Sequence, residues 1–369
     1  MLKFNDMTFS RKDKIENIRI WAIKHEKYLS PLFFFGGAVL DNLTLTRIDR
    51  FFDNIILLSY LVVSIVVIVL INLFQSKEIQ NKWTQLLPLI TQFTFGGLFS
   101  GFAIFYTKSA SLTTSWIFLL IIYGIFIANE RFRKYYEKID FQIQILFVAI
   151  FSYMIFFIPV ILKKMNALIF IFSGVLSLVI VYGLIVFFYR YVSNLGSNRG
   201  IKLVKNIFYI YIVFNIMYFT NIIPPVPLSL KHLEVYNYVE KSAEGNYLVR
   251  EEKISVKEIY KDWFNDFHRL PESPVYVYAS VFAPTDLNTE IIHIWQRYDE
   301  KDGKWQTVNE IKYPVKGGRD QGYRGYSVLY EGIPGKYRVY VKNVQGQTLG
   351  KIKFTVTESE ELDLKTESL

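Results

Sequence analysis

Apolar and polar positions divide the chain into two parts with different periods. Before residue 224, seven long apolar runs alternate with short polar loops, at 31–48, 54–74, 86–106, 113–129, 141–162, 167–189 and 207–223. Six of them contain no Asp, Glu, Lys, Arg or His and are about long enough to cross ~30 Å of hydrocarbon as helices. The pattern therefore predicts a membrane α-helical bundle of about seven transmembrane helices over residues 31–223.

The first run is the least apolar because it carries Asp41 and Asn42. One aspartate near the centre of a membrane helix costs about 3 kcal/mol on insertion scales, which offsets most of the contribution of the large apolar side chains. Residues 31–48 therefore need neighbouring helices to hold them in the bilayer. Asp41 is the candidate intramembrane polar residue, and we expect it to pair with Arg47 or Arg50 at the outer face rather than to belong to a transport pathway.

Gly97 and Gly101 stand four residues apart in the third run. Small residues at this spacing let two helix backbones approach closely. The spacing favours close packing of helices. The bundle as a whole is expected to anchor the protein, either as a single copy or as a homo-oligomer.

Three prolines within four positions, Pro224, Pro225 and Pro227, end the membrane pattern. Each proline lacks the N–H that a helix interior needs and favours extended backbone. Residues 224–231 are therefore predicted to form a stiff, proline-rich neck that leaves the bilayer in an extended conformation.

Residues 232–357 follow a two-residue period that is typical of strands. The predicted strands are two segments within 235–251 and the segments 275–282, 291–298, 323–330, 336–341 and 351–356, separated by glycine-containing turns. Ser255 and Glu258 match a capping box, which predicts one amphipathic helix ending at about His268. We expect a mainly-β, antiparallel sandwich domain with one short helix, followed by an acidic, disordered tail over 358–369.

The net charge of +9 is divided unevenly, because residues 1–230 carry 22 Lys/Arg and 11 Asp/Glu (+11) while residues 231–369 carry 20 and 22 (−2). Two loops, 131–138 and 190–205, are basic, and basic loops of membrane proteins face the cytoplasm. Two crossings separate them, so the C-terminal domain is predicted outside the cytoplasm and the N-terminus inside. Lys163-Lys164 falls on the outer side and is the exception.

Residues 1–30 are predicted to remain on the cytoplasmic side. They lack the short apolar run and small-residue cleavage site of a secretion signal. Residues 11–28 instead combine basic residues with apolar ones, which predicts a basic amphipathic helix that either lies on the anionic inner leaflet or binds a partner.

The residue types exclude several kinds of chemistry. There is no cysteine, so disulfides, thiolate metal sites and thiol nucleophiles are absent. None of the four histidines has further ligands at metal-binding spacing, and no catalytic or phosphate-binding motif occurs. We expect no metal and no cofactor. The cytoplasmic loops account for the basic excess, so the expected partner is the lipid bilayer and no nucleic acid is expected.

Residues 291–298 contain the candidate binding site. On a strand, His293 and Trp295 share one face, and Ile292 and Ile294 share the other. If the isoleucines enter the core, the first face points outward and suits a sugar or peptide, since the ring stacks and the polar groups donate hydrogen bonds. The alternative is that Trp295 belongs to the core and His293 is hydrogen-bonded inside. The candidate ligand-binding residues are His293, Trp295, Arg297, Arg324 and Tyr326.

Several segments of the chain occur together in one known family. They are the neck at 222–231, Ile292-His293-Ile294-Trp295, and the segments 322–327, 334–339 and 31–49. In these segments the chain resembles bacterial membrane proteins carrying domain of unknown function 2914, with Tyr323 and Tyr337 where the family often has tryptophan. The resemblance implies this architecture and a bacterial cell-envelope setting, and it implies no reaction.

These features predict a non-enzymatic, multi-pass protein of the bacterial cytoplasmic (inner) membrane, whose outer β-sandwich binds an envelope protein or a glycan. The alternative is a transporter or membrane-embedded enzyme with an accessory β domain. A polar cavity between the helices, lined by Asp41, Gln92, Gln142 or Asn215, would favour the alternative. A tightly packed bundle would favour the anchor.

Overall fold

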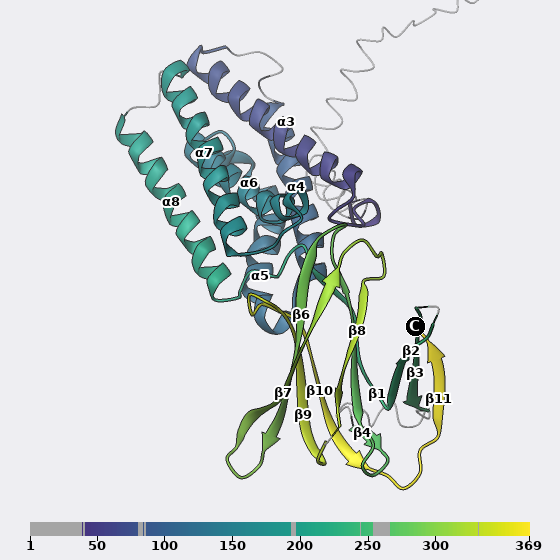
Figure 1. Ribbon diagram of the computed structural model, residues 1–369. Helices are drawn as coiled ribbons and strands as arrows, with labels where there is room; N and C mark the ends of the chain where they lie inside the picture. The colour runs from purple at the N-terminus through teal and green to yellow at the C-terminus, as the bar shows by residue number, and fades with distance from the viewer. Residues whose placement is uncertain are drawn as a thin grey trace, which may run out of the picture.

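The computed structural model describes residues 39, 41–79, 84, 86–192, 197–243, 245–253, 266–330 and 332–369. It shows a helical bundle with a β-rich domain against one end (Figure 1). The basic segment 11–28 and most of the first apolar run lie outside the described residues, although residues 41–44 are helical. Whether 31–48 crosses a membrane therefore stays a prediction.

Six α-helices and one short 3-10 helix form the described bundle. They are α3 (Phe51–Ser76), α4 (Leu87–Ser109), α5 (Leu112–Ala128), η1 (Asn129–Tyr135), α6 (Ile139–Leu162), α7 (Ala167–Tyr191) and α8 (Ser197–Phe219). Among the described residues, five helices are long and apolar enough to span a membrane, namely α3, α4, α6, α7 and α8. The 17-residue α5 is shorter. Helix α8 begins ten residues before the expected run at 207 and ends at Phe219 rather than at 223, because a turn precedes the prolines.

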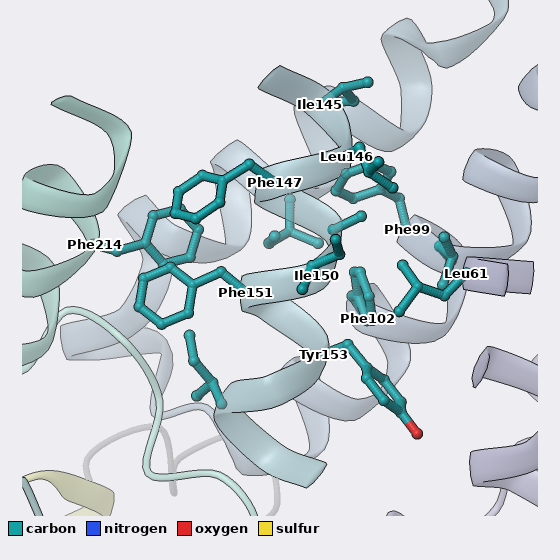
Figure 2. Close-up of a cluster of buried hydrophobic side chains, with 14 of the residues drawn as sticks. Leu61, Phe99, Phe102, Ile145, Leu146, Phe147, Ile150, Phe151, Tyr153 and Phe214 are labelled. Carbon is teal, nitrogen blue, oxygen red and sulfur yellow. The ribbon is translucent and has the colours of Figure 1, made fainter. Parts of the chain in front are cut away.

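Helix α6 lies at the centre of the bundle. Phe151 of α6 contacts Phe214 of α8, with the ring centroids 4.8 Å apart, and Phe99 and Phe102 of α4 belong to the same buried cluster (Figure 2). The interior is packed with aromatic rings, which suits a helix that is surrounded by other helices.

The glycine pair serves packing between α3 and α4. A Cβ added at Gly97 would lie 2.5 Å from the ring of Tyr60, and one at Gly101 would lie 2.6 Å from a methyl carbon of Leu57. Both partners belong to α3 of the same chain. The predicted close approach is confirmed within the bundle, and a homo-oligomer remains a prediction.

Eleven strands form three sheets in the described part of the β-rich domain. The strands are β1 (Ser229–Tyr236), β2 (Tyr238–Lys241), β3 (Tyr247–Glu252), β4 (Asp266–Arg269), β5 (Val275–Phe282), β6 (Asn288–Asp299), β7 (Lys304–Lys316), β8 (Tyr323–Leu329), β9 (Gly335–Asn343), β10 (Thr348–Glu358) and β11 (Leu364–Ser368). The sheet orders are β1-β5-β8, β4-β10-β9-β6-β7 and β11-β3-β2. All pairs are antiparallel except β10 with β4.

The three-stranded β1-β5-β8 sheet packs against the five-stranded sheet as a sandwich. Val277 and Ala279 of β5 enter the two cores together with Ile291, Val339 and Val341 from the facing sheet. The small β11-β3-β2 sheet covers the other face of β1-β5-β8 through a cluster that includes Tyr236, Tyr247 and Tyr278. The predicted strands at 275–282, 291–298, 323–330, 336–341 and 351–356 are confirmed.

The prediction of a disordered tail is wrong, and so is the predicted end of the amphipathic helix at about His268. The tail 358–369 is not disordered throughout, because β11 pairs with β3 and Lys365 forms an ion pair of 2.7 Å with Glu251. The helix expected to end at about His268 lies largely outside the described residues, and its expected end is strand β4, which pairs with β10. Backbone pairing to a neighbouring strand outweighs the local helical spacing at that position.

The neck is a buried set of turns rather than an extended stalk. Residues 223–229 are buried, and the N–H of Val226 donates to the carbonyl oxygen of Pro224 at 2.8 Å. Val226 belongs to the bundle core, whereas Leu228 belongs to the sandwich core. Burial of the apolar side chains between the prolines stabilises this arrangement, and an exposed, extended spacer would leave them in water.

Polar contacts from two loops of the bundle also hold the β-rich domain. One loop precedes α3 and the other joins α6 to α7. The contacting pairs are Arg47–Asp320, Asp49–Thr285, Lys163–Asp286 and Met165–Gln345. The two parts of the molecule are therefore joined by contacts from two loops as well as by the buried neck.

Candidate ligand-binding face

The predicted outward face of β6 points into the sandwich. His293 and Trp295 are 0 % exposed, while Ile292 and Ile294 on the other face are partly exposed. The prediction of an exposed His293–Trp295 face is therefore wrong, and the alternative, a core tryptophan with a hydrogen-bonded histidine, is correct.

A serine of β8 explains why the polar pair is inside. His293 Nδ1 lies 2.8 Å from Ser327 Oγ, and Trp295 Nε1 donates to the same oxygen at 2.9 Å. The other ring nitrogen of His293 lies 3.0 Å from the hydroxyl of Tyr313. Buried polar groups are tolerated when they are paired in this way. Burial lowers the pKa of His293 to about 3, so the ring is neutral in the folded domain.

The other predicted ligand-binding residues lie apart. Arg297 is partly buried beside Gly335. Arg324 donates to the carbonyl oxygen of Leu369 at 2.8 Å, and Tyr326 packs against Tyr276 with ring centroids 6.0 Å apart. Arg324 and Tyr326 face away from His293, on the side of β8 that the β11-β3-β2 sheet covers, whereas Arg297 lies on β6. The five candidates do not form one site.

Asp41 also differs from expectation. It is 9 % exposed and its side chain hydrogen-bonds Ser100 of α4. Arg47 instead forms ion pairs with Asp49 and Asp320. Asp41 therefore contributes to the packing of the bundle and not to the expected pair.

A different surface, the outward face of the five-stranded sheet, gathers charge and aromatic rings. Alternate side chains of β9 and β10 point away from the core. On this face of the two strands, all charged side chains before Glu358 are basic. We call the following set the basic–aromatic face: Gln296, Tyr298, Trp305, Lys336, Arg338, Tyr340, Lys342, Lys351 and Lys353. Their neighbours in sequence, such as Tyr337, Val339 and Phe354, fill the core.

Arg338 lies at the centre of this face. Its guanidinium carbon is 4.2 Å from the ring centroid of Trp305 and 5.2 Å from that of Tyr340, and its Nε donates to Gln296 at 2.7 Å. Lys342 and Lys351 also approach the ring of Tyr340, at 5.3 and 5.9 Å. Aromatic rings in this geometry hold the positions of the cationic side chains but do not neutralise their charge.

The positive charges of this face repel one another. Arg338 and Lys353 are directly opposite in the β9–β10 register, an arrangement that destabilises a sheet. Partial burial, and after it the charges of Lys353 and Arg338, hold the pKa of Lys351 below its ordinary value. At the margins, Lys336 lies 4.0 Å from Glu300, and Lys312 of β7 pairs with Glu310 at 3.1 Å.

The sequence contains a signal for this face that catalytic motifs do not reveal. Residues 332–357 include five Lys/Arg and no Asp or Glu, within a segment 231–369 of net charge −2. The basic positions also alternate with core residues in β9 and β10. Charge counted by strand face, rather than by domain, would have found it.

Comparison with known proteins adds a family match. Residues 288–356 match the family model described as "Protein of unknown function (DUF2914)", which confirms the expected resemblance over β6 to β10. No curated protein matches the chain.

Two solved structures show only weak similarity. The β-glucosidase from Listeria innocua in complex with gluconolactone is 11% identical, with a TM-score of 0.18, and the match covers 33% of this chain and 17% of that one. The alkylpurine DNA glycosylase AlkC of Pseudomonas fluorescens, bound to DNA containing an abasic site analogue, is 10% identical, with a TM-score of 0.22 and coverage of 84% and 99%. The chain thus spans about a sixth of the β-glucosidase. Neither similarity supports a fold or an activity. The matched family segment contains the strands that build the basic–aromatic face.

Proposed function

We propose that this is a non-enzymatic, multi-pass protein of the bacterial cell envelope that binds an anionic ligand outside the cytoplasmic membrane. In this proposal the bundle is the anchor, and the basic–aromatic face is the binding surface. The observation that carries it is the gathering of Lys336, Arg338, Lys342, Lys351 and Lys353 on one sheet face without acidic side chains between them in sequence. A repulsive cluster of this kind is stabilised by a ligand of opposite charge.

The charge distribution supports an orientation with the β-rich domain outside. Helix α5 begins and α8 ends beside the sheet, so η1 and the start of α8, which carry the basic loops, lie at the far end of the bundle. Basic loops favour the cytoplasmic side. Lys163-Lys164 is the basic pair at the end of the bundle next to the β-rich domain. Lys163 is accounted for there, because it forms an ion pair of 2.6 Å with Asp286 of that domain.

The interior of the bundle supports an anchor rather than a transporter. Asn72 donates to Gln142 at 2.6 Å, and Asn215 donates to the carbonyl oxygen of Tyr211 at 2.8 Å. Asp41 is paired with Ser100. Side chains that would line a polar pathway are thus engaged in contacts between and within helices.

Binding of dextran sulfate to the purified full-length protein in detergent tests this proposal, with neutral dextran as the reference polymer. We expect the double variant Lys351→Gln/Lys353→Gln to bind the sulfated polymer about tenfold more weakly, a change of about 1.4 kcal/mol. The matched control is Lys253→Gln/Lys365→Gln, which removes the same charge near the β11-β3-β2 sheet, where both lysines pair with carboxylates. Equal losses in the two variants would show that net charge, not this face, governs binding.

Orientation is tested separately. A reporter that is active only in the cytoplasm, fused after Leu369, should give no signal. A strong signal would place the β-rich domain in the cytoplasm and would contradict the proposed envelope role.

A further inference from the structure

A groove of about 370 Å³ separates the basic–aromatic face from the helices. The sheet lines one wall and the ends of α5 and α8 line the other. The lining residues are Thr114, Thr220 and Asn221 from the helices and Ile294, Gln296, Arg338, Tyr340, Lys342, Gly346 and Thr348 from the sheet. This volume lies within the range of small-molecule sites, which is about 300–1,000 Å³.

The sheet wall of the groove carries the charge. Arg338 and Lys342 contribute two cations, and Arg338 is held in place because its Nε donates to Oε1 of Gln296 at 2.7 Å. The helix wall contributes hydroxyl and amide groups and no charge. A guanidinium and an ammonium group converging on one space suit a phosphate group, which the first binds as a fork and the second as a point charge.

The helix wall also marks the level of a membrane surface. Helices α5 and α8 are neighbours, with the rings of Phe118 and Phe214 6.2 Å apart. Near the lining residues Thr114 and Thr220 in sequence, Trp116 is 54% exposed and Phe219 is 58% exposed. Exposed aromatic rings at the end of a spanning helix are typical of the bilayer interface. The groove therefore opens where the headgroup of a neighbouring lipid would lie.

We infer that the groove binds the phosphate-bearing headgroup of an anionic lipid in the leaflet on the side of the β-rich domain, with its chains along α5 and α8. This deepens the proposed function, on which it rests, by naming the ligand as a membrane lipid. A soluble polyanion would need only the part of the face away from the helices (Figure 1), where Lys336 and Lys353 lie outside the groove lining. A lipid explains why one wall of the groove is formed by the ends of two apolar helices.

Native mass spectrometry of the full-length protein, purified in detergent with equal amounts of phosphatidylglycerol and phosphatidylcholine, tests the inference. The wild-type protein should retain phosphatidylglycerol in preference to phosphatidylcholine. Arg338→Gln/Lys342→Gln should retain about tenfold less phosphatidylglycerol. Thr220→Trp fills the groove from the helix wall without changing charge, and it should lose the lipid while keeping its affinity for dextran sulfate.

The outcomes separate this inference from the proposed function. If the groove variants keep phosphatidylglycerol while wild-type protein binds dextran sulfate, the lipid site is wrong and the anionic-ligand function stands. If glycerol 3-phosphate displaces the lipid at equal concentration, the chains contribute nothing and a free phosphate ester is the ligand instead. If neither dextran sulfate nor phosphatidylglycerol binds, both proposals fail.

Discussion

The buried histidine makes the stability of the β-rich domain depend on pH in a predictable way. His293 is 0 % exposed, and burial lowers its pKa to about 3 in the folded domain. In the unfolded chain the pKa of a histidine is about 6.5. Between these values the unfolded state binds one more proton than the folded state, so the free energy of unfolding falls as the pH falls. Above about pH 6.5 this histidine does not change the free energy of unfolding. Below that pH the free energy of unfolding falls progressively, down to about pH 3.

The size of the effect follows from the same two values. A pH of about 5.0 lies one and a half units below the pKa of the unfolded histidine. At that pH the free energy of unfolding should be about 2 kcal/mol lower than at about pH 7.5. A domain of this length loses roughly 3 °C of melting temperature for each kcal/mol, so the transition should move down by about 6 °C. Most carboxylates are still ionised at about pH 5, which limits their share of the change.

Thermal unfolding of the full-length protein in detergent, followed by tryptophan fluorescence, measures this shift because Trp295 is buried beside His293. His293→Gln should unfold at a lower temperature at neutral pH but lose most of the dependence on pH. Ser327→Ala is the matched control, since it breaks the same network and leaves the histidine in place. It should be destabilised and keep the wild-type slope. An unchanged slope in His293→Gln would refute the assignment.

Two further predictions concern packing. Trp295→Ala should cost the β-rich domain about 3–5 kcal/mol, because it empties a fully buried position, and a loss below about 1 kcal/mol in thermal or chemical unfolding would contradict the observed burial. Gly97→Val should separate α3 from α4, since its Cβ would already lie 2.5 Å from Tyr60. We expect a lower melting temperature of the bundle, and Gly183→Val is the control, because no atom of the described residues lies within 4 Å of an added Cβ there.

The helices could be predicted from the sequence because long apolar runs have one physical explanation. A run of about 20 residues without charge is both a helix and a membrane span. The strands at 275–282 and 323–330 were also evident, since their alternation is regular. Strand β7 was missed because it lies at the sheet edge, where most of its side chains are exposed and no alternation of hydrophobicity is needed.

The face of β6 could not be chosen from its own sequence. Both faces carry large side chains, and a two-residue period does not say which face is buried. Ser327 decides it, because its hydroxyl pairs with both His293 and Trp295 from a strand more than 25 residues away. The tail was misjudged for a similar reason, since β11 is stabilised by pairing with the distant strand β3 and by ion pairs such as that of Lys365 with Glu251.

The buried neck changes how the proposed binding face works. An extended stalk would let the sandwich rotate, and the basic–aromatic face would then meet ligands in any direction. Instead, Val226 and Leu228 join the two cores, and Lys163 and Asp49 hold the domain from neighbouring loops. The groove wall formed by α5 and α8 is therefore kept opposite Arg338. A fixed groove loses less entropy on binding than one assembled by the ligand, so a firmly seated domain is what recognition of a membrane-borne ligand requires.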